Sequence, residues 1–438
     1  MIKSLRKSGD GGQSFPLPEA QERTLLWVLS AVQFAHILDF MIIMPLGPRL
    51  MEIFSISPSQ FGMLVSAYTV SAGLFGLAAA WVLDRFDRKT ALLWLYAGFA
   101  AGTVACALAP NFHFLLAARF FAGGFGGVSS ATILAVLGDA VPASRRGAAM
   151  GTVFRSFSLA SIAGVPLGLF LANHLGWHAP FFLLGGLGAA ILVAAYFILP
   201  SMRGHLDRSG RESPWREMKG ILGRVNHWRA FALTVVMTLA GFLVIPYISP
   251  SLVSNVGLSN EQLPLLYFFG GAATFFTMRW FGKIGDRYGL RRVFIPASLM
   301  TILPILAISN LPVVPLWAAL SITTLFMVFS SGRMVPGMAM VIASVEPRYR
   351  GGFMSINSAL QQFASGLAAM IAGMIIVQSP NGRLLRYGWV GALGAISILI
   401  SIYLASRLKV EDKGPGPGPA PGAAPQVEGA GGGGTLPG

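Results

Sequence analysis

A short charged sequence, Asp84-Arg85-Phe86-Asp87-Arg88-Lys89, follows a long apolar run. A related one, Asp286-Arg287-Tyr288-Gly289-Leu290-Arg291-Arg292, follows another apolar run 202 residues later. A second pair of related sequences, Arg146-Gly147-Ala148-Ala149-Met150 and Arg350-Gly351-Gly352-Phe353-Met354, lies 204 residues apart. Two independent pairs of motifs with nearly the same offset indicate that the chain consists of two related halves that arose by duplication. Duplication of apolar segments is typical of membrane transporters.

The composition is that of an integral membrane protein, because 54% of the residues are hydrophobic and only 11% are charged. Apolar runs of about 20 residues are long enough to cross a bilayer, and they must be helical because lipid cannot hydrogen-bond exposed backbone groups. The sequence predicts spans at 24–45, 59–83, 91–109, 113–138, 148–172, 179–199, 229–253, 262–284, 293–309, 313–342, 352–377 and 387–407.

We therefore predict an all-α membrane protein with 12 transmembrane helices, arranged as two pseudo-symmetric six-helix bundles. The expected segments are a cytoplasmic tail at 1–23, the first bundle at 24–199, a cytoplasmic linker at 200–228, the second bundle at 229–407 and a disordered tail at 408–438. The linker contains Trp215-Arg216-Glu217-Met218, which suggests a short amphipathic helix on the membrane surface.

Basic residues predict the orientation of the chain. If the amino terminus is cytoplasmic, 25 of the 32 Lys and Arg residues lie on that side and three lie in loops on the other. This bias places both termini in the cytoplasm. It also accounts for the formal net charge of +15 without a nucleic-acid partner. The single cysteine, Cys106, cannot form an internal disulfide and belongs to no metal-ligand cluster.

Three motifs give the chain a family resemblance. The loops at Asp84 and Asp286 resemble the cytoplasmic loop motif of the major facilitator superfamily, and Arg119-x-x-x-Gly123 looks like its second motif. The sequence Gly164-Val165-Pro166-Leu167-Gly168 resembles the motif of its antiporters. The resemblance covers 24–407 and is closest to twelve-span proton-coupled drug and sugar efflux proteins. It implies a monomer in a bacterial inner membrane.

The two loop motifs depart from the family pattern in different ways. The first copy has Ala80 and Asp87 where the family motif has glycine. The second copy keeps both glycines, Gly282 and Gly289, but inserts Leu290 before its basic pair. These departures concern the packing of the loops and leave the predicted fold unchanged.

The resemblance also implies a set of gating residues. Asp84 is expected to face the start of the eleventh helix near Gly351 when the inner gate is shut, and Asp286 to face the fifth helix near Gly147. An anion at a helix amino terminus is stabilised by about 0.3–1 kcal/mol, so both contacts would act as latches. The full gating set is Asp84, Arg85, Arg88, Asp286, Arg287, Gly164, Pro166 and Gly168.

Of the 17 carboxylates, Asp39 is the one expected deep in the membrane, about 22 Å from the inner end of the first span. Burying its charge costs on the order of 3 kcal/mol, so a partner is expected. Arg119 in the fourth span lies about 9 Å below the outer surface, against about 8 Å for Asp39. The sequence therefore predicts an Asp39–Arg119 pair.

Two interpretations of this pair stay open. It can be a structural ion pair that fixes helix register. Alternatively, Asp39 can gain and lose a proton, because burial favours the neutral acid whereas Arg119 favours the ion. In the efflux proteins that the chain resembles, such an acid and the motif arginine are implicated in proton coupling, which favours the second interpretation. His36, one turn before Asp39, can share the proton or serve only as a hydrogen-bond partner.

Two further arginines are expected inside spans, Arg155 in the fifth and Arg333 in the tenth. With Arg119 and Asp39 they leave the centre positive, which suits an anionic or zwitterionic substrate. The alternative is that they hydrogen-bond helix carbonyls. Pro336 predicts a break or bend in the tenth span. Other polar residues that can line a central cavity, or can instead join helices, are Gln33, Tyr68, Tyr247, Tyr267, Asn357, Gln361 and Gln362.

These patterns predict a secondary transporter that exports a small solute against proton entry, with a small-molecule substrate, protons and the lipid bilayer as its partners. A proton-coupled or uniport importer of an organic anion is the first alternative, because the fold does not set the direction. A non-transporting membrane sensor or assembly protein is the second, although it would need neither the loop motifs nor Asp39. The sequence has no nucleophile elbow, metal cluster or phosphate-binding glycine loop, so it predicts no enzyme activity and no cofactor.

Overall fold

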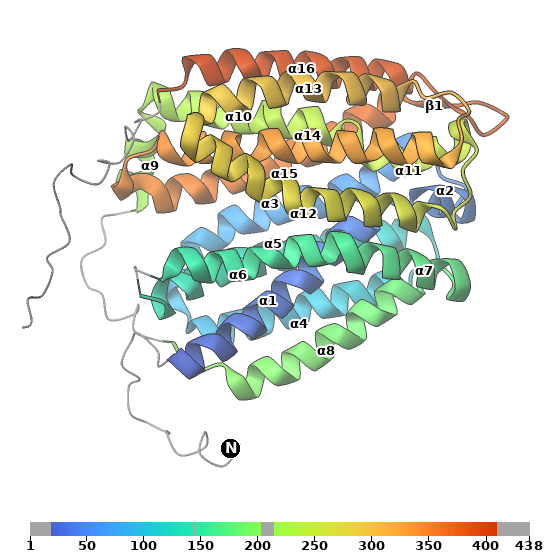
Figure 1. The fold of residues 1–438 in the computed structure, drawn as a ribbon. Helices are drawn as coiled ribbons and strands as arrows, with labels where there is room; N and C mark the ends of the chain where they lie inside the picture. Colours follow the sequence, from blue (N-terminus) through green and yellow to red (C-terminus); the bar gives the residue numbers. More distant parts are fainter. Residues whose placement is uncertain (1–18, 143–144, 203–213, 410–438) are drawn as a thin grey trace, which may run out of the picture.

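The computed structural model describes residues 19–142, 145–202 and 214–409, with side chains except at 19–20, 80–82, 84, 146, 214–217 and 347. The described chain is almost wholly helical (Figure 1). Most of the two predicted tails and the centre of the predicted linker, 203–213, lie outside the described residues.

The first half of the chain, here called the N half, forms the lower group of helices in Figure 1. Its elements are α1 (Glu19–Ile42), α2 (Gly47–Ile53), α3 (Pro58–Val82), η1 (Leu83–Arg85), α4 (Arg88–Ala107), α5 (Phe112–Ala140), α6 (Arg146–Leu159), the π-helical turn η2 (Ala160–Gly164), α7 (Val165–Leu175) and α8 (Ala179–Ile198).

The second half, the C half, forms the upper group in Figure 1. It follows α9 (Pro214–Leu222), a short helix at the predicted amphipathic segment of the linker. Its elements are α10 (Val225–Phe242), η3 (Ile245–Tyr247), α11 (Ile248–Ser251), the π-helical turn η4 (Leu252–Val256), α12 (Leu263–Tyr288), α13 (Leu290–Ser309), α14 (Leu316–Ala343), η5 (Pro347–Tyr349), α15 (Arg350–Ile375), the antiparallel strands β1 (Val377–Gln378) and β2 (Leu384–Leu385), and α16 (Tyr387–Arg407).

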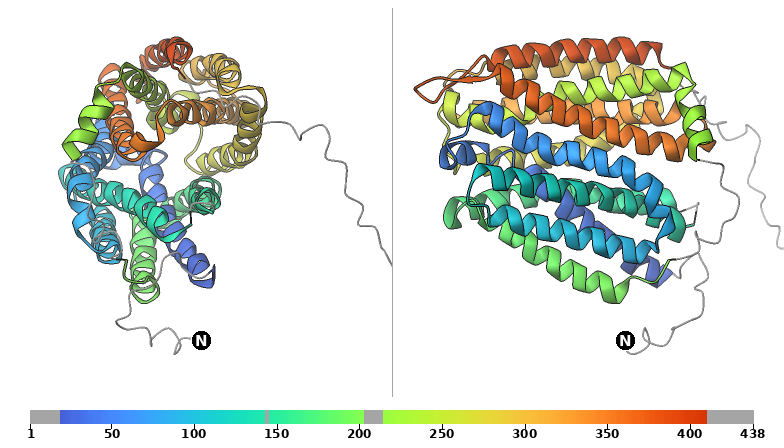
Figure 2. Two further views of the ribbon diagram at one scale, coloured as in Figure 1. Left: turned by 90° about the vertical axis from the view of Figure 1, so that its left-hand side faces the viewer. Right: turned by 180° about the vertical axis from the view of Figure 1, so that it is seen from behind.

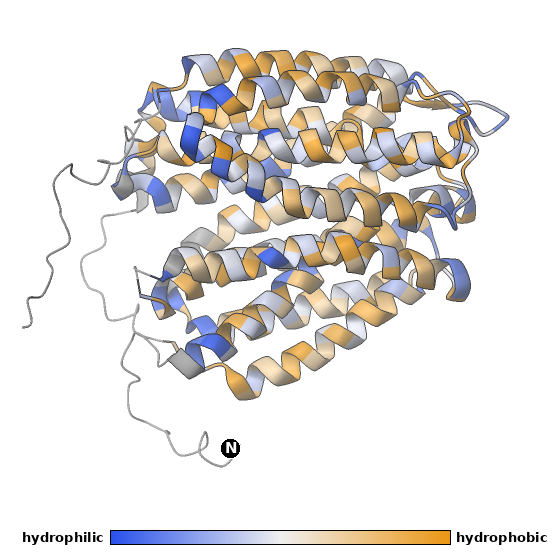
Figure 3. Cartoon of the chain, in the orientation of Figure 1, coloured by the Kyte–Doolittle hydropathy of each residue, from blue (hydrophilic) through white to orange (hydrophobic). Residues whose placement is uncertain are grey.

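Each predicted span coincides with one helix or with consecutive helical segments. Within the described residues, eleven of these segments are long and apolar enough to cross a bilayer. The helix α12 has the necessary length, 26 residues, but its last turns carry Arg279, Lys283 and Asp286. The prediction of an all-α membrane protein is therefore confirmed. Hydrophobic residues run along the helices, and many hydrophilic ones lie at the two ends of the molecule (Figure 3).

Two spans are interrupted where the sequence did not predict it. The seventh breaks after α10, which ends at Phe242, four residues before Pro246. Proline lacks an N–H group and its ring clashes with the carbonyl four residues back, which accounts for the break. The fifth changes to a π-helical turn just before its glycine motif. For the tenth span a break or a bend was predicted; α14 continues through Pro336, which excludes a break.

The two ends of the molecule differ. The helix α1 begins and α16 ends at one end, the terminus end, whereas the β1–β2 hairpin lies at the other, the hairpin end (Figure 1). The halves meet where α3 packs along α15 and where α12 packs on α7 and η2, and in both views of Figure 2 the C-half helices lie on one side and most N-half helices on the other. A Cβ at Gly366 of α15 would lie 2.7 Å from Thr69 Oγ1 of α3, so glycine permits this close approach.

The halves are held together at the hairpin end. The Tyr247 hydroxyl donates to the Pro58 carbonyl oxygen at 2.8 Å, and Asn173 Nδ2 donates to the Asn260 carbonyl oxygen at 2.9 Å. At the terminus end, the described side-chain hydrogen bonds and ion pairs join elements of one half, as in the pair of Arg145 with Glu22. The structure therefore represents a state closed at the hairpin end.

Asp87, which stands at a glycine position of the resembled loop motif, has a structural role. Its carboxylate accepts a hydrogen bond from Thr90 N at 3.3 Å, which caps α4, and another from Met202 N at 2.6 Å, just after α8. The next residue, Arg88, is buried and pairs with Asp139 of α5 at 3.2 Å. The loop therefore fixes the terminus ends of α4, α5 and α8 relative to one another.

We predict that Asp87→Ala lowers the stability of the protein by about 1–2 kcal/mol, because a helix cap and a second backbone donor lose their acceptor. Thermal unfolding of the purified protein in detergent measures this loss. Asp87→Asn keeps an acceptor oxygen and should retain most of the stability. An Asp87→Ala protein that unfolds at the wild-type temperature would contradict the assigned role.

Candidate functional site

Asp39 of α1 and Arg119 of α5 form an ion pair in the interior of the N half. Both side chains are 0% exposed, and Arg119 Nη1 lies 2.9 Å from Asp39 Oδ2. The same nitrogen donates to the Asp39 carbonyl oxygen at 3.1 Å, and Thr103 of α4 donates to Asp39 Oδ1 at 3.2 Å. The predicted contact is therefore present, and it joins three helices.

Tyr68 and His36 extend this pair into a longer chain of contacts. The Arg119 guanidinium carbon lies 4.3 Å from the centre of the Tyr68 ring, a cation–π arrangement. The Tyr68 hydroxyl is 2.8 Å from His36 Nδ1. The described link between His36 and Asp39 thus runs through Tyr68 and Arg119. One turn before His36, Gln33 Oε1 accepts a hydrogen bond from Ser130 of α5 at 2.8 Å.

Glycines of α5 let α1 and α3 approach it at this site. A Cβ at Gly126 would lie 2.6 Å from His36 Nδ1, and one at Gly123 would lie 2.2 Å from the Tyr68 carbonyl oxygen. Any larger residue would push His36 or Tyr68 away, so these glycines shape the site through packing. We call Gln33, His36, Asp39, Tyr68 and Arg119, together with Thr103, the N-half cluster.

The predicted substrate residues do not all meet in one place. Arg333 of α14 is 1% exposed and donates from Nη2 to the Met237 carbonyl oxygen at 3.0 Å, whereas Arg155 of α6 is exposed. Asn357 of α15 is fully buried, and Gln361 and Gln362 on the next turn are half-buried. Arg333 and Asn357 thus belong to the interior of the C half.

Two tyrosines of the C half were predicted to line a cavity, and they lie in the interrupted seventh span and in α12. Tyr247 is fully buried, and its hydroxyl contacts the backbone oxygens of Pro58 and Ala369. The Tyr267 hydroxyl lies 2.8 Å from Ser249 Oγ. In this state Tyr247 therefore joins the two halves, and its hydroxyl already has protein partners.

The latch implied for Asp286 is not formed in this state. Asp286 is exposed, and a Cβ at Gly147 or at Gly351 would meet nothing within 4 Å. Arg85 and Arg287 are also exposed, and the side chain of Asp84 lies outside the described residues. Contacts that close the terminus end are not expected in a state closed at the hairpin end, so the gating role stays a prediction.

The glycine motif of the fifth span packs α7 onto α1. A Cβ at Gly164 would lie 2.8 Å from Leu38, and one at Gly168 would lie 2.6 Å from Ile42. Pro166 directly follows the π-helical turn, and a proline inside a continuous helix removes one backbone hydrogen bond at this position. Leu38 is adjacent to Asp39, so this close packing sets the position of α1 at the level of the acid.

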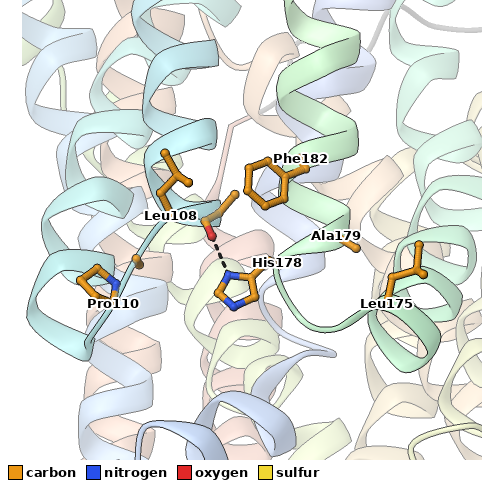
Figure 4. A pocket seen from close by; sticks show the side chains of 8 residues that line it. Leu108, Pro110, Leu175, His178, Ala179 and Phe182 are labelled. Atoms are coloured by element: carbon orange, nitrogen blue, oxygen red, sulfur yellow. Dashed lines mark hydrogen bonds between the residues drawn. The ribbon is translucent and has the colours of Figure 1, made fainter.

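Surface hollows lie away from these residues. One lies at the hairpin ends of α4 and α8, where His178 Nδ1 donates to the Ala107 carbonyl oxygen at 2.6 Å among mostly apolar neighbours (Figure 4). Another lies at the terminus end between Arg224 and Lys409. Neither contains a residue predicted to bind substrate.

A sequence model of the Major Facilitator Superfamily matches residues 29–284 and 230–431. The chain belongs to this superfamily. It is 26% identical over 381 residues to an uncharacterized MFS-type transporter, YceJ of Bacillus subtilis, a match that covers 86% of this chain and 95% of YceJ. It is 27% identical over 359 residues to the inner membrane transport protein YdhP of Escherichia coli, covering 80% and 87%.

Solved structures of this superfamily share the fold. A bacterial homolog of the human lysosomal transporter Spinster, inward-facing and occupied, aligns with a TM-score of 0.70 at 18% identity, covering 90% of this chain and 98% of that one. The D-xylose-proton symporter aligns with a TM-score of 0.71 at 15% identity, covering 88% and 97%. The chain is thus a multi-pass membrane protein of a transporter family, and we describe it as a secondary transporter.

We predict a strong energetic coupling between Asp39 and Arg119. Removing one partner of a buried ion pair leaves an unpaired charge and costs about 3–5 kcal/mol. Asp39→Asn and Arg119→Met should therefore each lower the thermal unfolding temperature in detergent, and the double variant should recover much of the loss. Additive losses in the double variant would show that the pair does not act as a unit.

Proposed function

We propose that this transporter is a proton-coupled antiporter, which exports a small solute while protons enter the cell, and that Asp39 carries the proton. The observation that carries the proposal is the fully buried Asp39–Arg119 pair. The Asp39 carboxylate can accept a proton, and the neutral acid then no longer balances the charge of Arg119. Proton binding therefore changes the charge inside the N half by one unit.

A change of charge at this depth can drive a change of conformation. An unpaired guanidinium in the interior is strongly unfavourable, so a conformation in which Arg119 reaches water or another anion gains relative stability when Asp39 is protonated. Arg119 also lies against Tyr68 of α3, and α3 packs along α15 of the other half. A displacement of Arg119 would thus act directly on the interface between the halves.

In the proposed orientation, the terminus end of the protein faces the cytoplasm. The excess of Lys and Arg near the terminus end supports a cytoplasmic location for that end in a bacterial inner membrane. The present state, closed at the hairpin end, would then be closed toward the outside. Asp286 and the basic residues of the loops would form the opposite gate when the terminus end closes. The protein would act as a monomer.

Import of an organic anion is the second candidate function. It is favoured by Arg333, a buried cation with no carboxylate partner among the described residues. The same fold can carry solute in either direction, because the gradients of proton and solute determine the net flux. Antiport and symport differ in their response to the sign of an imposed pH gradient, so one assay separates them.

We predict that proteoliposomes with an acidic lumen accumulate a substrate from a panel of anionic metabolites, sugars and cationic dyes. Protons leaving the lumen drive solute inward by antiport, whereas a symporter would require an acidic exterior. Asp39→Asn should abolish the gradient-driven accumulation, because the amide cannot carry a proton. It should leave exchange of labelled for unlabelled substrate, because asparagine has nearly the same shape as aspartate.

Glu52→Gln is the matched control. Glu52 is an exposed acid of α2 and does not belong to the N-half cluster. It should transport like the wild type. Undiminished gradient-driven transport by Asp39→Asn would exclude Asp39 as the coupling site. Accumulation only with an acidic exterior would replace antiport with symport.

A further inference from the structure

The C half contains buried polar atoms that have no hydrogen-bond partner in the described chain. Each belongs to a side chain that is at most 1% exposed. They are Nε and Nη1 of Arg333, Nδ2 and Oδ1 of Asn357, Oγ1 of Thr234 and Oγ of Ser298. Buried polar groups are normally paired, so four such side chains in one bundle need an explanation.

Helix contacts place Asn357 and Thr234 near the level of Arg333. The rings of Phe231 and Phe353 stack at 4.4 Å, which sets α10 beside α15. Both helices run from the terminus end toward the hairpin end, so one turn beyond this stack lie Thr234 and Asn357. Met237, whose carbonyl oxygen binds Arg333 at 3.0 Å, follows Thr234 by about 5 Å along α10.

Ser298 of α13 lies at the same level along the helix axes as Arg333 of α14. The Phe294 ring would lie 3.1 Å from a Cβ at Gly337, which sets α13 beside α14. These two helices run in opposite directions, so one turn toward the hairpin end leads from Phe294 to Ser298 and from Gly337 to Arg333. We call Thr234, Ser298, Arg333 and Asn357 the C-half cluster.

The chemistry of this cluster selects for negative charge. Arg333 is a permanent cation with several N–H donors and one described acceptor, the Met237 oxygen. The amide of Asn357 and the hydroxyls of Thr234 and Ser298 can each donate another hydrogen bond. A carboxylate or a phosphate accepts such hydrogen bonds and neutralises the guanidinium, whereas a cation would be repelled.

We infer that the C-half cluster binds the carboxylate or phosphate group of the transported solute, an inference that rests on the proposed transport function. The substrate is then anionic or zwitterionic, with Arg333 as the charge partner and Asn357 as a hydrogen-bond partner. The half-buried Gln361 lies one turn beyond Asn357 on α15 and extends the row of polar side chains on this helix. Arg333 is closed off in this state, so the anion enters when α14 and α15 move.

Anion-dependent stability of the purified full-length protein tests the inference. Thermal unfolding in detergent is measured with millimolar acetate, inorganic phosphate or tetramethylammonium chloride, at constant ionic strength. We expect acetate or phosphate to raise the unfolding temperature by several degrees in a saturable way, because a ligand that binds the folded state stabilises it. A response to acetate alone indicates a carboxylate substrate, and a response to phosphate alone indicates a phosphorylated one.

Arg333→Met should remove this response. It should also unfold at a higher temperature than the wild type without anion, because a buried unpaired charge is lost. A purely structural arginine would give the opposite result, a lower unfolding temperature. Asn357→Leu keeps the charge and should weaken the response. Arg279→Met, a change at an exposed arginine of α12, is the control and should keep the full response.

Two outcomes would overturn the inference. One is an equal response to anions in the wild type and in Arg333→Met, which would reflect the general effect of salts on stability. The other is no response to either anion in the wild type. The assay uses no pH gradient, so its outcome does not depend on proton coupling. Failure of this inference is therefore distinguishable from failure of the proposed proton coupling.

Discussion

The ion pair between Asp39 and Arg119 is the constraint on which the N half depends. Two opposite charges are stable inside a bilayer only when each neutralises the other and further hydrogen bonds complete their coordination. Thr103 supplies one of these bonds, and the Tyr68 ring covers the guanidinium. Because the contacts come from four helices, the pair fixes their relative positions, and the glycines of α5 and α7 provide the space that this arrangement requires.

The two halves differ at the position that Asp39 occupies in the N half. The offset of 202 residues between the loop motifs places Gly241 in the position that corresponds to Asp39. A Cβ at Gly241 would lie 4.0 Å from Arg333 Nη2. The N half thus has an acid paired with an arginine, whereas the C half has an arginine beside a glycine. The halves therefore differ in charge: the N half holds an acid–arginine pair, whereas Arg333 of the C half has no carboxylate partner among the described residues.

The sequence predicts the spans well because apolar length is a local property, and it predicts the Asp39–Arg119 contact because both depths follow from helix geometry. It does not predict which proline interrupts a helix. Pro246 and Pro336 both follow long apolar runs, yet only the first marks a break, and the difference lies in tertiary packing. Thr103, Thr234 and Ser298 could not be recognised as site residues, since single hydroxyls in apolar helices show no periodic signal. The gating role of the loop motifs stays a prediction, because it concerns contacts of another conformation.

The contacts that join the halves at the hairpin end share one chemical property. Tyr247 and Asn173 each donate from a side chain to a main-chain oxygen, at Pro58 and at Asn260. Main-chain acceptors persist whatever residue occupies these positions, so substitutions there leave the acceptors in place. Evolution can therefore adjust the balance between the two conformations through the donor residues alone, without a compensating change in the opposite half.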